Sequence, residues 1–338
     1  MNDNITPYVR YIGADDKDLD LFESQYVVPQ GISYNSYVIT DEKIAVMDTI
    51  DQRKTEEWTV RLEEALEGRT PDYLIVQHME PDHAANIGWF AEKYPEATIV
   101  ASAKAIQMMP QFFEEVNFAG RTQTVKEGDT LCLGQHTLKF IMAPMVHWPE
   151  VMLTYEESEK ILFSADAFGK FGALCHEGEW IDEARRYYFN IVGKYGAQVQ
   201  ALLKKAAGLD IAMICPLHGP VLKENLGYYI GLYDTWSKYE PETEGVVVAY
   251  ASIHGNTAAA ARRMAEILSE KGAAEVMLID LCRDDMALAV ESAFRYSKMI
   301  VAASSYDAGV FPPMFDFLHH LQIKNFQIRF SYILNNNR

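Results

Sequence analysis

The chain has 338 residues, with 30 basic and 48 acidic side chains and a formal net charge of −18. This length exceeds one ordinary core and favours two domains, and so negative a surface argues against nucleic acid and anionic membranes as partners. The first residues lack the basic segment and apolar core that are typical of a secretory signal peptide, and no uncharged apolar run is long enough to cross a bilayer. We therefore expect a soluble cytoplasmic protein.

The four cysteines have no C-x-x-C spacing, which argues against a disulfide scaffold, a cysteine zinc site and an iron–sulfur cluster. We expect them to be small buried apolar residues in a reducing compartment.

The first two thirds of the chain mix strand-like and helical patterns. Strand-like runs at 33–40 and 43–50 precede a helix-period stretch from Arg53 to Leu66. Further apolar runs at 72–77, 97–102 and 160–165 then alternate with helical patterns at 84–93, 103–113 and 187–207. These patterns predict an α/β (α+β) fold with two mixed sheets flanked by helices.

Residues 237–245, "SKYEPETEG", are polar and predict a linker. Beyond them, strand-like runs at 245–251, 275–281 and 298–305 alternate with helical patterns, which is typical of a doubly wound parallel sheet. We therefore predict two domains, residues 1–243 and 244–338.

The densest group of reactive side chains follows the buried run at 72–77. In a chain of this composition, His-x-acid-x-acid-His is expected by chance only about 0.005 times. A solvated polar loop is the alternative, and it suits one histidine beside one acid better than four such residues at a strand end. The four residues are His78, Glu80, Asp82 and His83.

Three further candidates follow later apolar runs: His147, Asp166 and His218. Each alone is weak, because a single histidine near a strand end is more often a surface or capping residue. Together the donors exceed what one four-coordinate zinc needs, and they suggest two metals that share a bridging carboxylate.

This donor pattern resembles the metallo-β-lactamase superfamily, which folds as an αββα sandwich. Glu80 stands where ordinary hydrolases of that superfamily have histidine, and the following flavodoxin-like pattern makes the whole chain resemble the flavodiiron proteins, or A-type flavoproteins. A carboxylate in place of an imidazole favours iron over zinc. The resemblance implies that one iron is held by His78, Glu80 and His147, the other by Asp82 and His218, and that Asp166 bridges them.

The resemblance leaves the roles of three residues open, and it suggests a structural role for a fourth. His83 either binds the second iron or stands aside for water. Asp48 resembles the superfamily's recurrent strand-end aspartate, for which we expect a structural role. Trp148 and Tyr195 either shape the substrate pocket or are packed aromatic residues.

The stretch "YASIHGNTAAAA" resembles the phosphate loop of flavodoxins, where backbone N–H groups and a helix N-terminus bind the FMN phosphate. The alternative is a plain strand-to-helix turn with Thr257 near the N-cap. A second loop would border the flavin ring where the strand order reverses, and its Tyr306 either stacks on the ring or simply packs. The predicted FMN-binding residues are Ser252, Ile253, His254, Gly255, Asn256 and Thr257, with Ser304, Ser305, Tyr306, Asp307, Ala308 and Gly309.

A flavodoxin-like sheet has five strands in the order 2-1-3-4-5. Only three are secure here, and the final run offers at best a fourth, so the second domain is expected to be truncated. We expect weakened FMN binding and an open apolar edge at residues 328–334 that is prone to aggregation or proteolysis.

The resemblance implies an oxidoreductase that reduces O₂ to water, NO to N₂O, or both, with electrons relayed through FMN. It implies an external donor such as rubredoxin or a reduced deazaflavin, and a head-to-tail homodimer or a tetramer built as a dimer of dimers. Two alternatives stay open: a hydrolase of the same superfamily acting on a thioester or lactone, and a truncated chain that binds metal without catalysis.

Overall fold

The computed structural model describes residues 4–176, 178–327 and 330–336. Its internal contacts divide the chain into two compact units, Met1–Trp180 with Ala201–Tyr229, and Ile181–Gln200 with Ile230–Arg338. The segment 181–200 thus packs with the C-terminal part of the chain, a feature that the sequence pattern does not predict. The predicted domain boundary between residues 243 and 244 stays a prediction.

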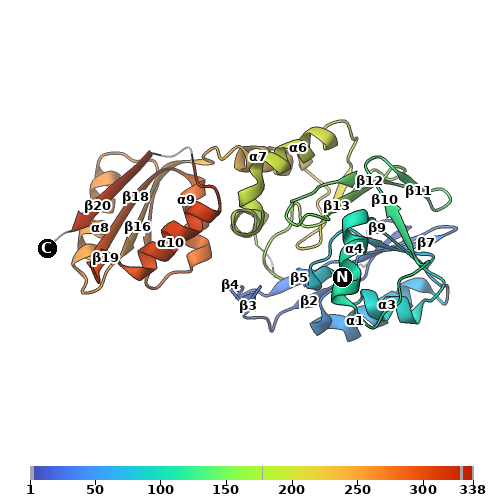
Figure 1. Cartoon of the computed structure of the whole chain (residues 1–338). Helices are drawn as coiled ribbons and strands as arrows, with labels where there is room; N and C mark the ends of the chain where they lie inside the picture. The colour runs from blue at the N-terminus through green and yellow to red at the C-terminus, as the bar shows by residue number, and fades with distance from the viewer. Residues whose placement is uncertain (1–3, 177, 328–329, 337–338) are drawn as a thin grey trace. The chain divides into compact units, whose positions relative to one another are not determined.

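The first unit contains two mixed sheets (Figure 1). The first sheet has the order β1-β6-β7-β8-β9-β10, with antiparallel pairs up to β7 and parallel pairs beyond it. Its strands are β1 (Val9–Tyr11), β6 (Tyr37–Thr40), β7 (Ile44–Met47), β8 (Tyr73–Val76), β9 (Thr98–Ser102) and β10 (Thr122–Val125).

The second sheet of this unit is antiparallel except where its last two strands pair. It has the order β11 (Thr130–Cys132), β12 (Thr137–Met142), β13 (Met152–Glu156), β14 (Ile161–Phe163) and β15 (Met213–Cys215). Short pairs are formed by β2 (Ala14–Asp16) with β5 (Ile32–Tyr34) and by β3 (Leu21–Phe22) with β4 (Tyr26–Val27).

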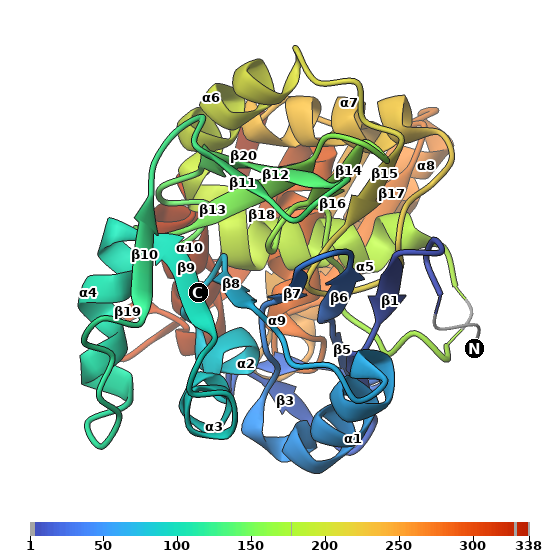
Figure 2. The same cartoon turned by 90° about the vertical axis from the view of Figure 1, so that its right-hand side faces the viewer.

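The core of the first unit lies between its two sheets. Ile75 and Val100 of one sheet join Phe140 and Phe163 of the other in a single buried cluster. On the outer side of the first sheet lie α1 (Thr55–Leu66) and α3 (Ile87–Lys93) (Figure 2). Helix α1 buries Trp58, Leu62, Ala65 and Leu66, whose three- and four-residue spacing forms one apolar face. The predicted mixed sheets flanked by helices are confirmed.

Short helices connect the strands of the first unit. Among them are α2 (Pro81–Ala84) and α4 (Ala103–Phe112). Three further helices have residues in both units: α5 (Trp180–Tyr187), α6 (Gly196–Ala206) and α7 (Leu226–Ser237). Of the cysteines, Cys215 is buried, but Cys132 and Cys175 are exposed, so the expectation that all four are buried is wrong.

The second unit contains a parallel sheet in the order β17 (Val276–Asp280), β16 (Thr243–Ala251), β18 (Tyr296–Tyr306) and β20 (Phe330–Asn336). This is the 2-1-3-4 part of a flavodoxin-like sheet. The final run therefore supplies the fourth strand, while Ile328 and Arg329 of the predicted open edge lie outside the described residues.

Helices cover both faces of this sheet, which explains why the middle parts of its central strands, residues 246–251 and 299–303, are apolar. Val246, Val248 and Tyr250 of β16 pack with Ala258 and Ala261 of α8 (Asn256–Glu270). The helices α9 (Met286–Arg295) and α10 (Pro312–Ile323) lie on the opposite face from α8 (Figure 1).

The predicted linker is short and anchored. Only residues 238–242 separate α7 from β16. Glu242 accepts hydrogen bonds from Arg185 Nε and from Trp236 Nε1, both at 2.7 Å, and Arg185 also pairs with the buried Glu291 at 2.8 Å. The predicted linker is thus held in place by a buried arginine, Arg185, through Glu242.

Candidate metal centre and cofactor loops

The four clustered residues directly follow β8. His78 lies two positions beyond the strand, and Glu80 precedes α2, whose first residue is Pro81. Proline suits this position because the first N–H of a helix has no partner within the helix. The helix is tied to the loop after β7, because the amide and hydroxyl of Thr49 both donate to the carbonyl oxygen of His83. The local chain therefore presents all four side chains at one sheet edge.

The first donor set consists of two imidazoles and two carboxylates. Nε2 of His147 lies 3.0 Å from Oε2 of Glu80 and 3.1 Å from Oδ2 of Asp166. Nε2 of His78 lies 3.2 Å from each of the same two oxygens. His78, Glu80, His147 and Asp166 thus form a group whose donor atoms all lie within 4.8 Å of one another.

The second donor set consists of Asp82, His83 and His218. The Nε2 atoms of the two histidines lie 3.1 Å apart, and Oδ2 of Asp82 lies 3.3 Å from His83 and 3.2 Å from His218. Oδ1 of Asp166 lies 3.2 Å from Nε2 of His83 and 3.8 Å from Nε2 of His218. The two oxygens of one carboxylate therefore face the two sets.

Several polar atoms of these sets are buried without a hydrogen-bond partner in the part of the chain that the structure describes. They are both carboxylate oxygens of Asp82, Oδ1 of Asp166 and Nδ1 of His83. A buried polar atom without a partner costs roughly 1 to 3 kcal/mol. Cations between the donors would satisfy the carboxylate oxygens, so the residues present fit a pair of metal ions.

The charges in the site depend on one another. Burial raises the pKa of the Asp166 carboxyl, but the neighbouring charge of His78 and hydrogen bonds from the imidazoles hold that pKa well below its usual range. Burial lowers the pKa of His147, but hydrogen bonds to Asp166 and Glu80 outweigh it and raise that pKa to about 9. Burial raises the pKa of Asp82 to about 7. Without metal the site therefore holds protons, which metal ions must displace.

Two imidazoles have a partner on the side away from the donor sets. Nδ1 of His78 lies 2.8 Å from Oε1 of Glu150, and Nδ1 of His218 lies 2.6 Å from the carbonyl oxygen of Ser33. Sequence reasoning missed both partners. Glu150 lies three positions after the candidate ligand His147 in the sequence. An acidic residue so close to a candidate ligand is a signal that its carboxylate hydrogen-bonds one of the ligand imidazoles, and here that imidazole is His78. A backbone carbonyl such as that of Ser33 gives no sequence signal.

Asp48 lies outside both donor sets. Its carboxylate accepts hydrogen bonds from the amide and the side chain of Gln77, at 2.7 and 2.8 Å. These bonds connect the ends of β7 and β8, which agrees with the expected structural role.

The two aromatic candidates lie in different units. The half-buried ring of Trp148 lies edge-on to His78 at 5.4 Å and 6.3 Å from the ring of His147. Tyr195 belongs to the second unit, and its contribution to a substrate pocket stays a prediction.

The predicted phosphate loop lies between β16 and α8 in the second unit. Ser252 Oγ accepts a hydrogen bond from the amide of Gly255, whose φ of +91° is left-handed and favours glycine. The hydroxyls of Thr257 and Ser304 lie 3.0 Å apart, so the two predicted loops meet. The residues of the first loop from 253 to 256 are exposed.

The second predicted loop differs from expectation. Ser304, Ser305 and Tyr306 continue β18, which turns back at Asp307 and Ala308 into β19 (Gly309–Val310). Both turn residues have positive φ, 47° and 59°, as tight hairpins with right-handed strand twist require. Ser304, Ser305 and Tyr306 thus lie at the end of the central strand, and their place beside a flavin ring stays a prediction.

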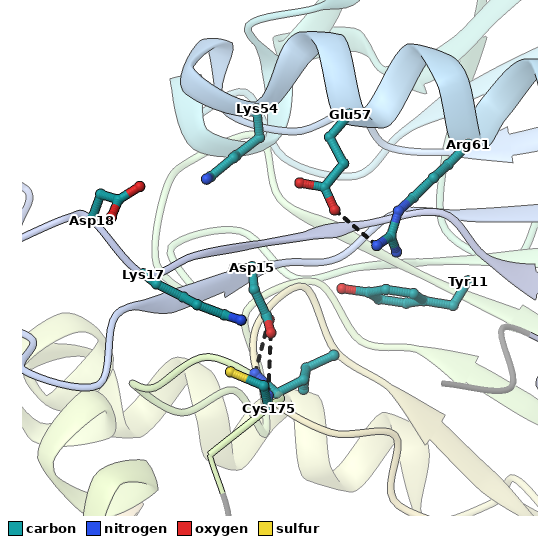
Figure 3. Close-up of a pocket in the computed structure, with 9 residues that line it drawn as sticks. Tyr11, Asp15, Lys17, Asp18, Lys54, Glu57, Arg61 and Cys175 are labelled. Atoms are coloured by element: carbon teal, nitrogen blue, oxygen red, sulfur yellow. Dashed lines mark hydrogen bonds and ion pairs between the residues drawn. The ribbon is translucent and has the colours of Figure 1, made fainter.

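A separate cavity of about 490 Å³ opens in the first unit (Figure 3). The carboxylate of Asp15 accepts hydrogen bonds from the amides of Leu174 and Cys175, and Glu57 pairs with Arg61 at 2.8 Å. Lys17, Lys54 and Asp18 also line the cavity. The mixture of both charge signs indicates no single class of ligand.

The comparisons with known proteins agree with this geometry. Residues 32–219 match the family described as ODP family beta lactamase. The chain is 30% identical, over 95% of its length and 66% of the relative, to an anaerobic nitric oxide reductase flavorubredoxin from Aliivibrio fischeri. It spans only 49% of a putative diflavin flavoprotein from Synechocystis, to which it is 32% identical over 82% of its own length. The chain is thus shorter than these curated relatives.

Two solved structures resemble nearly the whole chain. The flavodiiron protein from Giardia intestinalis superposes with a TM-score of 0.92 and 26% identity, covering 99% of this chain and 83% of that one. The rubredoxin:oxygen oxidoreductase from Desulfovibrio gigas gives a TM-score of 0.91 and 26% identity, covering 98% and 84%. The chain belongs to the ODP family of beta lactamases and, by its two-unit architecture and its relatives, to the flavodiiron proteins.

Proposed function

We propose that this chain is a flavodiiron oxidoreductase that reduces O₂ to water, NO to N₂O, or both. The observation that carries the proposal is the carboxylate of Asp166, which directs one oxygen to each of two sets of histidine and carboxylate donors. When bound, the iron pair would supply the position at which the diatomic molecule binds and is reduced, and FMN would relay the electrons.

In this proposal, the first iron is held by His78, Glu80 and His147, and the second by Asp82 and His218, with Asp166 between them. The structure supports His83 as a further ligand of the second iron, because its Nε2 lies among the donors of that set. Glu80 makes the first set harder and more anionic than three imidazoles would be. Such a set favours iron over zinc and disfavours the hydrolase alternative.

The surrounding residues orient the donors and limit water. The donors are buried or nearly so, and the ring of Trp148 lies against two of the imidazoles. A small uncharged molecule such as O₂ or NO loses little hydration on entering such a site, whereas a large charged substrate loses much more.

For FMN we propose the strand ends of the second unit as the binding site. The N-terminal amides of α8 and the hydroxyls of Ser252 and Thr257 would bind the phosphate, and residues Ser304 to Gly309 would border the ring. The four parallel strands, in the order expected around a flavodoxin-like switch point, support this assignment.

The named relatives suggest the partners. One is named a rubredoxin:oxygen oxidoreductase and another an anaerobic nitric oxide reductase flavorubredoxin. We therefore propose an external rubredoxin-like donor, with a reduced deazaflavin as the alternative, and a head-to-tail homodimer or a dimer of such dimers. Within the described residues, no helix is long and apolar enough to cross a membrane. A cytoplasmic location is part of the proposal.

The test is consumption of O₂ and NO by protein purified anaerobically, supplied with iron and FMN, and driven by a reduced rubredoxin. We expect turnover of at least one of the two gases that depends on both cofactors. Thioester or lactone hydrolysis by a zinc-loaded, flavin-free protein would contradict the proposal. Stoichiometric iron binding without turnover would instead support a metal-binding chain without catalysis.

A further inference from the structure

We propose that Glu150 is a positioning residue that makes the two metal positions unequal, so that the position at His78 binds its ion more tightly than the position at His218. This inference rests on the proposed two-metal site. It goes further by naming a residue that fixes the order in which the positions fill.

Glu150 is held firmly by its surroundings. It is 1% exposed, and its Oε1 atom accepts hydrogen bonds from Nδ1 of His78 and from the amide of Met79, both at 2.8 Å. Its backbone carbonyl accepts a hydrogen bond from Ser102 Oγ at 2.7 Å. Side chain and backbone are thus fixed together, and they fix the plane of the His78 ring.

The contact also determines where the proton of His78 lies. Oε1 of Glu150 also accepts the backbone amide of Met79 at 2.8 Å, and a backbone amide can only donate, so the geometry identifies this oxygen as the acceptor toward His78 as well. Nδ1 of His78 therefore donates to Glu150, and Nε2 is the atom that faces the first donor set and would bind a metal ion once its own proton is displaced. A carboxylate behind an imidazole also increases the ring's basicity as a ligand.

The second set lacks this support. His218 donates from Nδ1 to the neutral carbonyl of Ser33, and Nδ1 of His83 has no hydrogen-bond partner among the residues that the structure describes. In the types of donor the sets are alike, because each has two imidazoles, one carboxylate of its own and one oxygen of Asp166. The negative charge of Glu150 is the difference between them that the contacts reveal.

The experiment is a titration of the metal-free full-length protein with Co²⁺, followed by calorimetry and by the visible absorption of the bound ion. We expect two binding steps that differ at least tenfold in affinity. Anomalous scattering from crystals grown with one equivalent of Co²⁺ should place the ion at His78. In Glu150→Gln, loss of an outer partner should weaken the first step about 10- to 100-fold and leave the second step unchanged.

The matched control is Glu156→Gln. Glu156 is also a fully buried glutamate that accepts backbone amides, those of Ser158 and Glu159, but it lies outside both donor sets. Both binding steps should persist in this variant. In Glu150→Asp, which keeps the charge but shortens the side chain, the affinity of the first step should lie between those of the wild type and Glu150→Gln. This variant takes the place of Glu150→Gln if circular dichroism shows that the glutamine variant does not fold.

Two unchanged steps in a folded Glu150 variant, or first occupancy at His218 in the wild type, would overturn this inference while leaving the two-metal site intact. A wild-type protein that binds fewer than two Co²⁺ ions would overturn the proposed site itself, and the inference with it.

Discussion

The Oδ2 atom of Asp166 lies 3.1 Å from Nε2 of His147, while the other oxygen of the same carboxylate faces the second donor set. Asp166 is 1% exposed, so water cannot easily replace either contact. The two donor sets are therefore linked through one side chain.

Asp166→Ala should abolish binding of both ions, because each set loses a carboxylate oxygen. We expect less than 0.2 iron per chain by elemental analysis, as a rough limit that follows from losing the bridge. Asp210→Asn, which changes an exposed acid of the same unit, is the control and should retain the wild-type iron content. Two irons in Asp166→Ala would show that this residue does not bridge.

Glu80→His should shift the metal preference toward zinc. The first set would then contain three imidazoles, which suit zinc at least as well as iron. Protein produced with equal iron and zinc should show a zinc-to-iron ratio several times that of the wild type. An unchanged ratio would mean that Glu80 does not determine which metal binds.

Metal binding should release protons at neutral pH. In the metal-free protein the pKa of His147 is raised to about 9 and that of His78 lies well above its usual range, so both imidazoles hold protons at pH 7. Protons compete with metal, so affinity should rise as the pH increases from about 6 to about 9. Calorimetry in buffers of different ionisation enthalpy measures the protons released. Affinity that falls with rising pH over this range would contradict the site's charge assignment.

Thr257→Val should weaken FMN binding about fivefold, because we expect the hydroxyl to contribute roughly 1 kcal/mol through its contacts with the phosphate and Ser304. Thr257 is buried at the start of α8, and its hydroxyl lies 3.0 Å from that of Ser304. Quenching of flavin fluorescence gives the dissociation constant. The control is Ser269→Ala near the far end of the same helix, whose hydroxyl donates a hydrogen bond to the carbonyl of Ala265. Equal weakening in both variants would point to general loss of helix stability rather than to the site.

Arg185→Ala should destabilise the second unit by about 3 to 5 kcal/mol, because Glu242 and Glu291 would lose the cation that neutralises them. Arg263→Ala, which removes an exposed arginine on α8, should cost less than about 1 kcal/mol. Urea unfolding followed by circular dichroism and by the summed tryptophan fluorescence, to which Trp236 of the second unit contributes, measures both. A cost below about 1 kcal/mol for Arg185→Ala would mean that the two glutamates find other partners.

The sequence predicts that the candidate donors follow buried strands, and the structure brings these residues together in two sets. Each candidate follows a strongly apolar run, and buried strands are the elements whose pattern is clearest, as at β8 before His78. Glu150 and Ser33 were missed because one partner is an ordinary acid in a loop and the other is a backbone carbonyl. The sequence predicts a helix at 187–207, but it cannot show that Arg185, just before this stretch, packs against Glu291, which lies more than one hundred positions away.

The hairpin after β18 was missed for a local reason. Asp307 and Ala308 are not the asparagine–glycine pair that signals such a turn, yet both adopt positive φ, and Tyr306 pairs with Gly309. The fourth strand was only a weak expectation, because its pairing with β18 joins segments separated by α10.

The most direct test of the central claim is the iron and flavin content of the full-length protein, purified anaerobically with iron supplied, by elemental analysis and visible spectroscopy. The account predicts two irons and one FMN per chain, with the spectrum of an oxidised flavin in air. Zinc without flavin would contradict it.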